Sequence, residues 1–282
     1  MDQRYVQEVI DRALREDLSL GDPTTDALIP PHLSGSARLV ARRDGVLAGV
    51  DVALAAFTRV EPAIEGRALL LDGDRLKPGE AIATLSGPLA GMLKAERTAL
   101  NFLQRMSGIA SLTAQFVEAV DGTDARIVDT RKTAPGLRAL DKYAVTCGGG
   151  GNHRFNLGDL VLIKDNHVAA LEAEGVSLSQ AVRRARTRAR HNLRIEVEVE
   201  NLEGAREALR GGADIILLDN MPVAEMQKAV EAVGGRAVTE ASGNVSLDNV
   251  AAIAGTGVDL ISVGELTHSV RALDIGLDYA GE

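Results

Sequence analysis

The sequence predicts an α/β protein in which a small N-terminal α+β unit with an antiparallel sheet precedes a parallel α/β barrel. Two observations lead to this fold class. Before about residue 90, short strand patterns alternate with turns rich in glycine and proline. After residue 126, strand-like runs alternate with helix-like segments, and the last four strands begin about 20 to 24 residues apart, which suits βα repeats. Because only six strands are evident, a doubly wound open sheet remains the structural alternative.

Composition restricts the class of protein and its partners. The chain has 282 residues, 45% hydrophobic and 25% charged, which is ordinary for a globular protein. A net charge of -9, 2% aromatic residues and the lack of Trp argue against a nucleic-acid partner. Cys147 is the single cysteine, so an intramolecular disulfide is excluded. The N-terminus is polar and no apolar run approaches roughly 20 residues, so we expect a cytoplasmic protein without a membrane partner.

In the first part of the chain, the patterns predict helices around short strands. Apolar residues at helical spacing predict a helix over residues 2–16, and a second helix is expected over residues 50–60. Alternation over residues 36–49 predicts a strand, with Asp44-Gly45 as a hairpin turn. The segments RALLL and AIATLSGP predict further strands, which completes a small α+β unit.

A helical segment over residues 91–120 joins this unit to the barrel, as one long helix or as two that break at Ser107-Gly108. The strands predicted after it lie at residues 126–130, 160–163, 194–200, 214–219, 236–241 and 260–264. The predicted helices between them lie at residues 178–190, 202–210, 223–233 and 247–254. In a barrel, the residues that follow each strand form the active face.

Residues 126–167 are basic in an otherwise acidic protein. They contain Arg126, Arg131, Lys132, Arg138, Lys142, His153, Arg154, Lys164 and His167. A solvated helix face would repeat such charges at helical spacing. Here they follow predicted strands or a run of four glycines, so we predict an anion site, with the glycines as a flexible loop that lets His153 and Arg154 move onto a ligand.

The segment RIEVEVE places Glu196, Glu198 and Glu200 on one face of a strand. If the apolar face packs under helices, these carboxylates point into the barrel and need partners, because burying an unpaired charge costs several kcal/mol. The alternative is an edge strand with its acidic face in water. Lys164 and Asp219 each end an almost continuous apolar run, as expected for strands covered on both faces.

A lysine and several carboxylates at one barrel mouth suit a divalent cation that carries a phosphorylated ligand. Ser242-Gly243-Asn244 and Gly264 follow the last two predicted strands, where barrels often bind phosphate through loop amides. The sequence SGN is equally common in ordinary turns, so its position among the strands is what favours phosphate.

Taken together, the motifs resemble one family, the quinolinate phosphoribosyltransferases. The resemblance rests on EDLSLGDPTTD, AERTALNFLQRMSGIAS, DTRKTAPGLRALDKYAV, GGGGNHRFNLGDLVLIKDNH, EVEV, ILLDN, EASGN and SVGELTHSVRALDIGLD. It implies an N-terminal α+β open sandwich over residues 1–108, to which residues 268–282 return, and an irregular α/β barrel over residues 109–267, in a type II phosphoribosyltransferase-like fold. It also implies a homodimer with shared active sites.

The resemblance implies that phosphoribosyl diphosphate and quinolinate yield nicotinate mononucleotide, diphosphate and CO2, in de novo NAD biosynthesis. The residues it implies for the quinolinate carboxylates are Arg131, His153, Arg154, Lys164 and, from the partner subunit, Arg97. Those it implies around phosphoribosyl diphosphate and Mg2+ are the catalytic Lys132, Glu198 and Asp219, with the two acids as metal ligands. For the phosphates it implies Lys132, Ser242, Gly243, Gly264 and His268, together with Asn244, which stands where glycine is usual.

Three other functions remain open at this point. A Schiff-base aldolase would also use a lysine at a strand end, here Lys164. A non-catalytic sensor of a phosphorylated metabolite would use the phosphate loops alone. A related phosphoribosyltransferase would act on another pyridine or aromatic acid.

Overall fold

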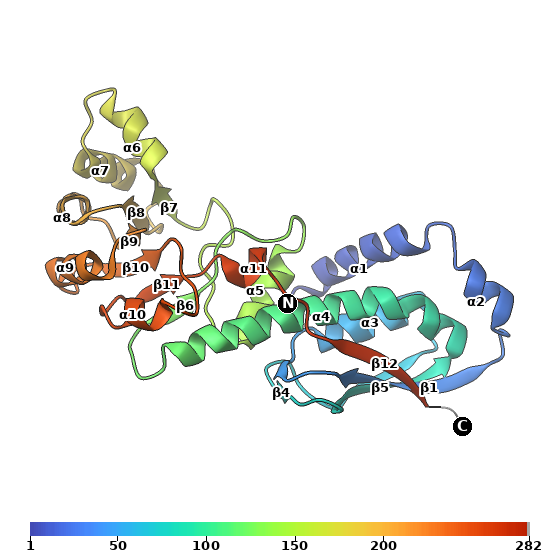
Figure 1. Cartoon of the computed structure of the whole chain (residues 1–282). Coiled ribbons are helices and arrows are strands. Elements are labelled where there is room, and N and C mark those ends of the chain that lie inside the picture. Colours follow the sequence, from blue (N-terminus) through green and yellow to red (C-terminus); the bar gives the residue numbers. More distant parts are fainter. Residues whose placement is uncertain (281–282) are drawn as a thin grey trace. The chain divides into compact units, whose positions relative to one another are not determined.

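The computed structural model describes residues 1–280 and divides the chain into two units (Figure 1). The first unit comprises residues 1–114, residues 133–149 and the C-terminal residues from 269. The second comprises residues 115–132 and 150–268. The sequence-based division placed residues 133–149 in the barrel, whereas the structure groups them with the first unit. The last two residues of the predicted C-terminal return lie outside the described part of the chain.

The first unit contains a four-stranded antiparallel sheet. Its strands are β1 (Ser34–Ala41), β3 (Glu65–Ala68), β5 (Ala81–Pro88) and β12 (Ile275–Ala280), in the order β12-β1-β5-β3. The predicted alternation of β1 holds as far as Leu39, since Ala37 and Leu39 are buried and Arg38 is exposed, but Val40 and Ala41 are both buried. The C-terminal strand β12 pairs with β1 along its whole length, which brings the end of the chain back to the N-terminal unit.

The predicted hairpin at Asp44-Gly45 is wrong. β1 pairs with β5 and β12, whereas β2 (Gly45–Val46) pairs with β4 (Arg75–Leu76) in a separate two-stranded ribbon. Gly45 serves close packing, since a Cβ there would lie 2.7 Å from the Leu273 side chain. Tertiary contacts therefore override the local turn signal.

The helices of this unit follow from local signals and packing. They are α1 (Gln3–Leu18), α2 (Pro23–Leu28), α3 (Val50–Val60), most of α4 (Leu89–Ala119) and α5 (Arg138–Cys147). α4 is continuous, so the proposed break at Ser107-Gly108 does not occur. A Cβ on Gly108 would lie 2.3 Å from the backbone oxygen of Arg271, so this glycine allows another chain segment to pack closely on the helix.

The second unit is built on six parallel strands, all of them predicted. They are β6 (Arg126–Val128), β7 (Val161–Ile163), β8 (Ile195–Val199), β9 (Ile215–Asp219), β10 (Val238–Ser242) and β11 (Leu260–Ser262), in the order β6-β11-β10-β9-β8-β7. The first strand pairs with the last and every other strand with its sequence neighbour. This is barrel order, whereas a doubly wound sheet reverses direction at a switch point.

The barrel is irregular on one side. Within residues 1–280, β6 and β7 do not pair with each other, and Gly151 instead forms a parallel bridge to Val128 on β6. The helices of the unit are α6 (Asp165–Glu172), α7 (Leu178–Arg188), α8 (Leu202–Gly211), α9 (Val223–Val233), α10 (Val250–Ala254) and α11 (Glu265–His268). α7, α8 and α9 pack side by side along the sheet (Figure 1).

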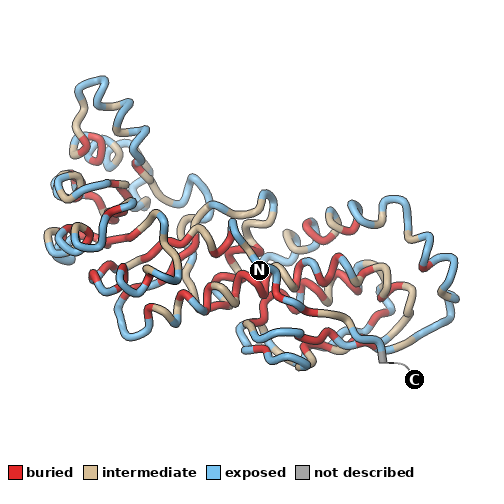
Figure 2. The backbone as a smooth tube through the Cα atoms, in the orientation of Figure 1, coloured by how far each residue is buried: buried red, intermediate tan, exposed pale blue. Residues whose placement is uncertain are grey.

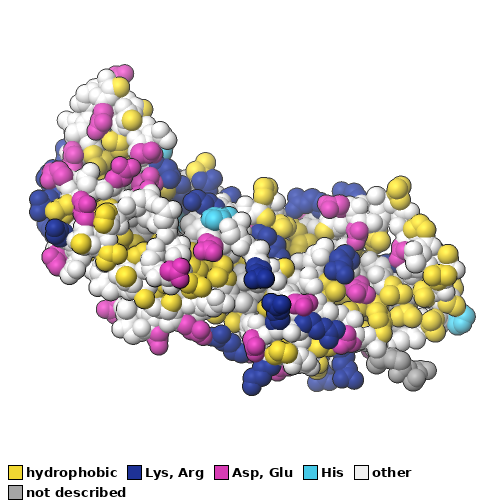
Figure 3. Space-filling model, viewed as in Figure 1, with side chains coloured by type: hydrophobic (Ala, Val, Ile, Leu, Met, Phe, Trp, Pro, Cys, Tyr) yellow, Lys and Arg dark blue, Asp and Glu magenta, His cyan; other side chains and the backbone are white. Residues whose placement is uncertain are grey.

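Buried residues mark the barrel strands and much of α4 (Figure 2). Acidic and basic side chains are interspersed on the face shown in Figure 3. Among the described residues, no helix combines the length and the apolar character needed to cross a bilayer. All six barrel strands run in one direction, so the polar residues at their carboxyl ends meet at one face.

Candidate active site

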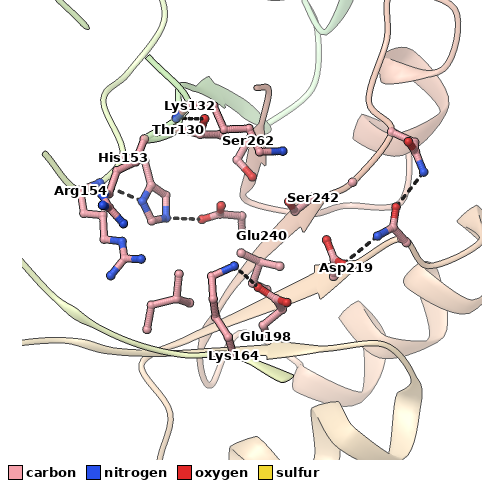
Figure 4. Close-up of a pocket in the computed structure, with 16 residues that line it drawn as sticks. Thr130, Lys132, His153, Arg154, Lys164, Glu198, Asp219, Glu240, Ser242 and Ser262 are labelled. Atoms are coloured by element: carbon pink, nitrogen blue, oxygen red, sulfur yellow. Dashed lines mark hydrogen bonds and ion pairs between the residues drawn. The ribbon is translucent and has the colours of Figure 1, made fainter. Parts of the chain in front are cut away.

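A cavity of about 620 Å³ lies within the second unit, at the carboxyl ends of the strands (Figure 4). It receives side chains that follow β6, β7, β8, β9, β10 and β11. The predicted site residues that line it are Arg131, Lys132, His153, Arg154, Lys164, Glu198, Asp219, Ser242, Gly243 and Asn244. The rule that the residues after each strand form the active face therefore identified residues that share this cavity, although some lie more than a hundred positions apart in the sequence.

Three predicted residues do not line this cavity. Gly264 and His268 lie beside it, since a Cβ on Gly264 would be 3.1 Å from both the Lys132 and the His268 side chains. Arg97 lines a different cavity of about 390 Å³ within the first unit, together with Arg12 and Arg105.

The cations in the cavity are held by nearby polar groups. Lys164 Nζ lies 2.9 Å from Glu198 Oε2, so the amine that the Schiff-base alternative needs is engaged by a carboxylate. The Lys132 carbonyl accepts a hydrogen bond from the Thr267 hydroxyl at 2.8 Å. Burial and the neighbouring Arg131 charge lower the pKa of Arg154, as expected where positive charges are gathered for an anionic ligand.

The carboxylates of Glu196 and Glu198 on strand β8 point into the barrel, as predicted. It lies between β7 and β9, so the edge-strand alternative is wrong. Glu196 is fully buried and the Glu198 side chain is 14% exposed. Glu200 follows the strand and is exposed, so the alternation ends before it.

Glu196 meets His153 and Glu240 in a buried cluster beside the cavity, and Figure 4 shows the contact between His153 and Glu240. His153 Nε2 lies 3.2 Å from Glu196 Oε2 and 3.3 Å from Glu240 Oε2. Burial opposes a charge on the ring, but the two carboxylates outweigh it and raise the pKa of His153 to about 10. Burial also raises the pKa of Glu196, and the charge of Glu240 adds to this effect. The cluster therefore retains an extra proton at neutral pH.

The other ring nitrogen of His153 faces the backbone. The backbone N–H of Arg154 donates to His153 Nδ1 at 2.8 Å, and Nε2 faces the two carboxylates as a donor. The three groups are close enough to hold a metal ion, but Nε2 acts as a donor and is not available as a ligand.

His153 is also fixed through its backbone. Asp129 is fully buried, and its carboxylate accepts hydrogen bonds from the His153 N–H and from Asn152 Nδ2, both at 2.8 Å. Gly151 exchanges backbone hydrogen bonds with β6 and Asp129. The glycine segment was predicted to be a flexible loop, but these bonds hold its C-terminal end against the sheet.

Six cavity residues were given no role from the sequence, although Thr130 and Asn220 stand at the ends of predicted strands. They are Thr130, Leu162, Leu217, Asn220, Glu240 and Ser262. Glu240 could have been found, because strand alternation places it on the inward face of β10, as it places Glu196 on β8. Asn220 and Asp129 gave no separate signal, since their roles depend on hydrogen bonds formed only in the folded chain.

Glu198 and Asp219 fit a divalent cation. They extend from the adjacent strands β8 and β9 into one cavity, and carboxylate oxygens are the ligands that Mg2+ prefers. Two protein carboxylates leave coordination positions for water and for phosphate oxygens of a substrate.

Comparison with known proteins shows the family of the chain. The chain matches the N-terminal domain of quinolinate phosphoribosyl transferase over residues 22–107 and the C-terminal domain over residues 109–278. It is 50% identical over 279 residues to the carboxylating nicotinate-nucleotide pyrophosphorylase of Mycobacterium leprae, which covers 96% of each chain. It is 42% identical to a probable carboxylating nicotinate-nucleotide pyrophosphorylase of Bacillus subtilis, over 99% of this chain and 94% of that one.

Comparison with solved structures points to the same family. The crystal structure of NadC from Streptococcus pyogenes superposes with a TM-score of 0.94 at 40% identity, covering 100% of this chain and 99% of that one. Both family models and the full-length relatives therefore cover the barrel cavity together with the N-terminal sheet. The chain belongs to the quinolinate phosphoribosyltransferase family.

Proposed function

We propose that this chain transfers the 5-phosphoribosyl group of phosphoribosyl diphosphate to quinolinate with decarboxylation, in de novo NAD biosynthesis. The products are nicotinate mononucleotide, diphosphate and CO2. The observation that carries the proposal is one cavity in which Arg131, Arg154 and Lys164 stand beside the carboxylates of Glu198 and Asp219. Family membership supports the same reaction.

The cations suit the dianionic substrate. Quinolinate has two adjacent carboxylates, and arginine can bind such groups through paired hydrogen bonds. Since both ring nitrogens of His153 are engaged by the protein, the carboxylates fall to Arg131, Arg154 and Lys164. Fixing both carboxylates directs the pyridine nitrogen toward the anomeric carbon, which is catalysis by positioning.

The bond changes follow from this arrangement. The pyridine nitrogen forms a bond to the anomeric carbon as the bond from that carbon to diphosphate breaks. Glu198 and Asp219 stabilise the positive charge that develops on the ribose. The ring nitrogen is then cationic and stabilises the electron pair left at C2 when the C2 carboxylate leaves as CO2. A proton takes its place on C2, so the substrate itself provides the electron sink.

We further propose that Glu198 and Asp219 hold Mg2+, directly or through water. The ion would neutralise the diphosphate leaving group. Lys132 and the segment from Ser242 to Asn244 would bind phosphate oxygens, with Gly264 and His268 beside them. The chain would work in the cytoplasm as a homodimer, with Arg97 of the partner subunit completing each site.

The direct test is turnover of quinolinate with phosphoribosyl diphosphate and Mg2+, detecting CO2 and the mononucleotide, with nicotinate in parallel. We expect quinolinate to be turned over and nicotinate not, because the cation cluster binds the second carboxylate that only quinolinate carries. Arg131→Ala should lose most of this turnover. Equal turnover of nicotinate, or near-wild-type rates for Arg131→Ala, would contradict the assignment of the cavity.

A further inference from the structure

A chain of side-chain amides runs from helix α10 to the Asp219 carboxylate. Asn249, at the start of α10, donates from Nδ2 to the Asn244 carbonyl at 2.9 Å. Asn244 Nδ2 donates to Asn220 Oδ1 at 2.9 Å, and Asn220 Nδ2 donates to Asp219 Oδ2 at 2.7 Å. The last of these bonds is visible beside Asp219 in Figure 4.

The backbone on both sides of this chain is constrained. Asn220 and Asn244 have φ values of 52° and 48°, in the left-handed region that few residues other than glycine adopt. Gly243, at φ 89°, leaves room for the Asn220 amide, since a Cβ at Gly243 would lie 2.3 Å from Asn220 Oδ1. Such conformations persist only where the surrounding contacts hold them, so the two loops are built to fit each other.

Backbone hydrogen bonds link the same loops. Asp219 and Ser242 are partners in the β9–β10 ladder, and the Asn220 N–H donates to the Ser242 carbonyl at 2.9 Å. The Asn220 amide uses its oxygen toward the loop after β10 and its nitrogen toward Asp219. A shift of residues 242–244 therefore turns the Asn220 amide and, with it, the carboxylate it holds.

We propose that Asn220 and Asn244 are positioning residues that make phosphate binding at residues 242–244 and divalent-cation binding at Asp219 strengthen each other. This inference rests on the proposed function for the identity of the ligands. It assigns a role to the two asparagines in left-handed conformations. It predicts that the two ends of a phosphorylated sugar diphosphate are bound cooperatively.

The test measures the dissociation constant of Mn2+ from the full-length chain by electron paramagnetic resonance, with and without ribose 5-phosphate. We expect saturating ribose 5-phosphate to lower the wild-type constant at least about fivefold, with a reciprocal effect of Mn2+ on ribose 5-phosphate. Asn244→Gly relieves the left-handed backbone but removes the amide donor. In this variant, the Mn2+ dissociation constants with and without ribose 5-phosphate should be equal. Asn244→Asp, which keeps the shape but cannot donate, should behave in the same way.

Asn201→Gly is the matched control, because Asn201 caps α8 through Gly204 and does not line the cavity. Glycine is tolerated at such a cap, so the coupling should persist. Coupling that survives both Asn244 variants, or its absence from the wild-type chain, would overturn the inference. Quinolinate turnover of the same wild-type preparation separates the two proposals: turnover without coupling rejects only this inference, whereas no turnover rejects the proposed function.

Discussion

Glu240 shows how one buried side chain can matter to a neighbouring site. Neither of its carboxylate oxygens has a hydrogen-bond partner within the described structure, although Oε2 lies 3.3 Å from His153 Nε2. A buried carboxyl group without a hydrogen bond is retained at a cost to stability. In return, Glu240 orients the His153 ring. The ring accepts a hydrogen bond from the Arg154 N–H, so it also orients the segment that carries the Arg154 guanidinium.

We therefore predict that Glu240→Gln lowers kcat for quinolinate by about 10- to 100-fold, because a small misplacement of a binding group has effects of this order. The melting temperature should stay the same or rise, since an amide is less costly to bury than a carboxylate. Enzyme kinetics and calorimetry on one preparation measure both. Glu200→Gln, at an exposed position, is the control and should change neither.

Cys147 gives a prediction about pH. Burial, with the Asp72 charge adding to it, raises the pKa of the Cys147 thiol to about 11, although a hydrogen bond with Tyr143 opposes the shift. The folded state thus favours the neutral thiol. The stability gained is fully present below the unfolded pKa of about 9 and is lost as pH rises through the folded value.

At pH 8 the folded chain should react with a disulfide reagent at least about a hundred times more slowly than the chain unfolded in urea, because the thiolate is the reactive form. The absorbance of the released thiol measures both rates. A folded rate close to the unfolded one would show that Cys147 is exposed and ordinary.

At the scale of elements, α5 is held to α4 by a buried ion pair. Asp141 is fully buried and accepts hydrogen bonds from Arg105 Nε at 2.9 Å and Nη2 at 2.8 Å, and from the Ala134 N–H at 3.0 Å. This contact explains why residues 133–149 group with the first unit. No helix was predicted from the sequence at α5, and nothing in the sequence pairs Asp141 with Arg105.

Asp141→Asn should lower the free energy of unfolding by about 3 kcal/mol, since it removes the buried carboxylate that accepts two hydrogen bonds from Arg105. Urea denaturation followed by circular dichroism measures the change. Asp278→Asn breaks an exposed ion pair with Arg42 and should leave the unfolding midpoint almost unchanged. A similar effect of the two substitutions would contradict the role given to burial.

The sequence predicted the elements whose signals are local. Alternating or continuous apolar runs located all six barrel strands, and the rule that strand ends form the active face located most of the cavity. What it missed depends on partners far away in the chain. The hairpin at Asp44-Gly45 was wrong because β1 takes its partners from residues 81–88 and 275–280, and Asn220 gained its role only from the loop after β10.

For the whole molecule, the proposed shared site predicts complementation. Arg97→Ala and Arg131→Ala should each lose most turnover alone. Mixed dimers would carry both lesions in one site and none in the other, so an equimolar exchanged mixture should recover about a quarter of wild-type activity. The measurement is turnover after subunits are mixed in mild urea and dialysed.

The control for this experiment mixes Arg131→Ala with Arg154→Ala. Both residues line the cavity of their own chain, so every site in every dimer keeps one lesion and activity should not return. If Arg97→Ala with Arg131→Ala also fails to recover, Arg97 does not act across a dimer.

The pairing of early strands with late ones also bears on how the chain is made. β1 needs β12 and β6 needs β11, so the two sheets are complete only after residues 280 and 262 have been made. At about 5 to 20 residues per second, synthesis leaves β6 without β11 for roughly 7 to 27 seconds. During that interval its edge is open to pairing with other nascent chains. Protection of the growing polypeptide by chaperones should therefore matter most at β1 and β6.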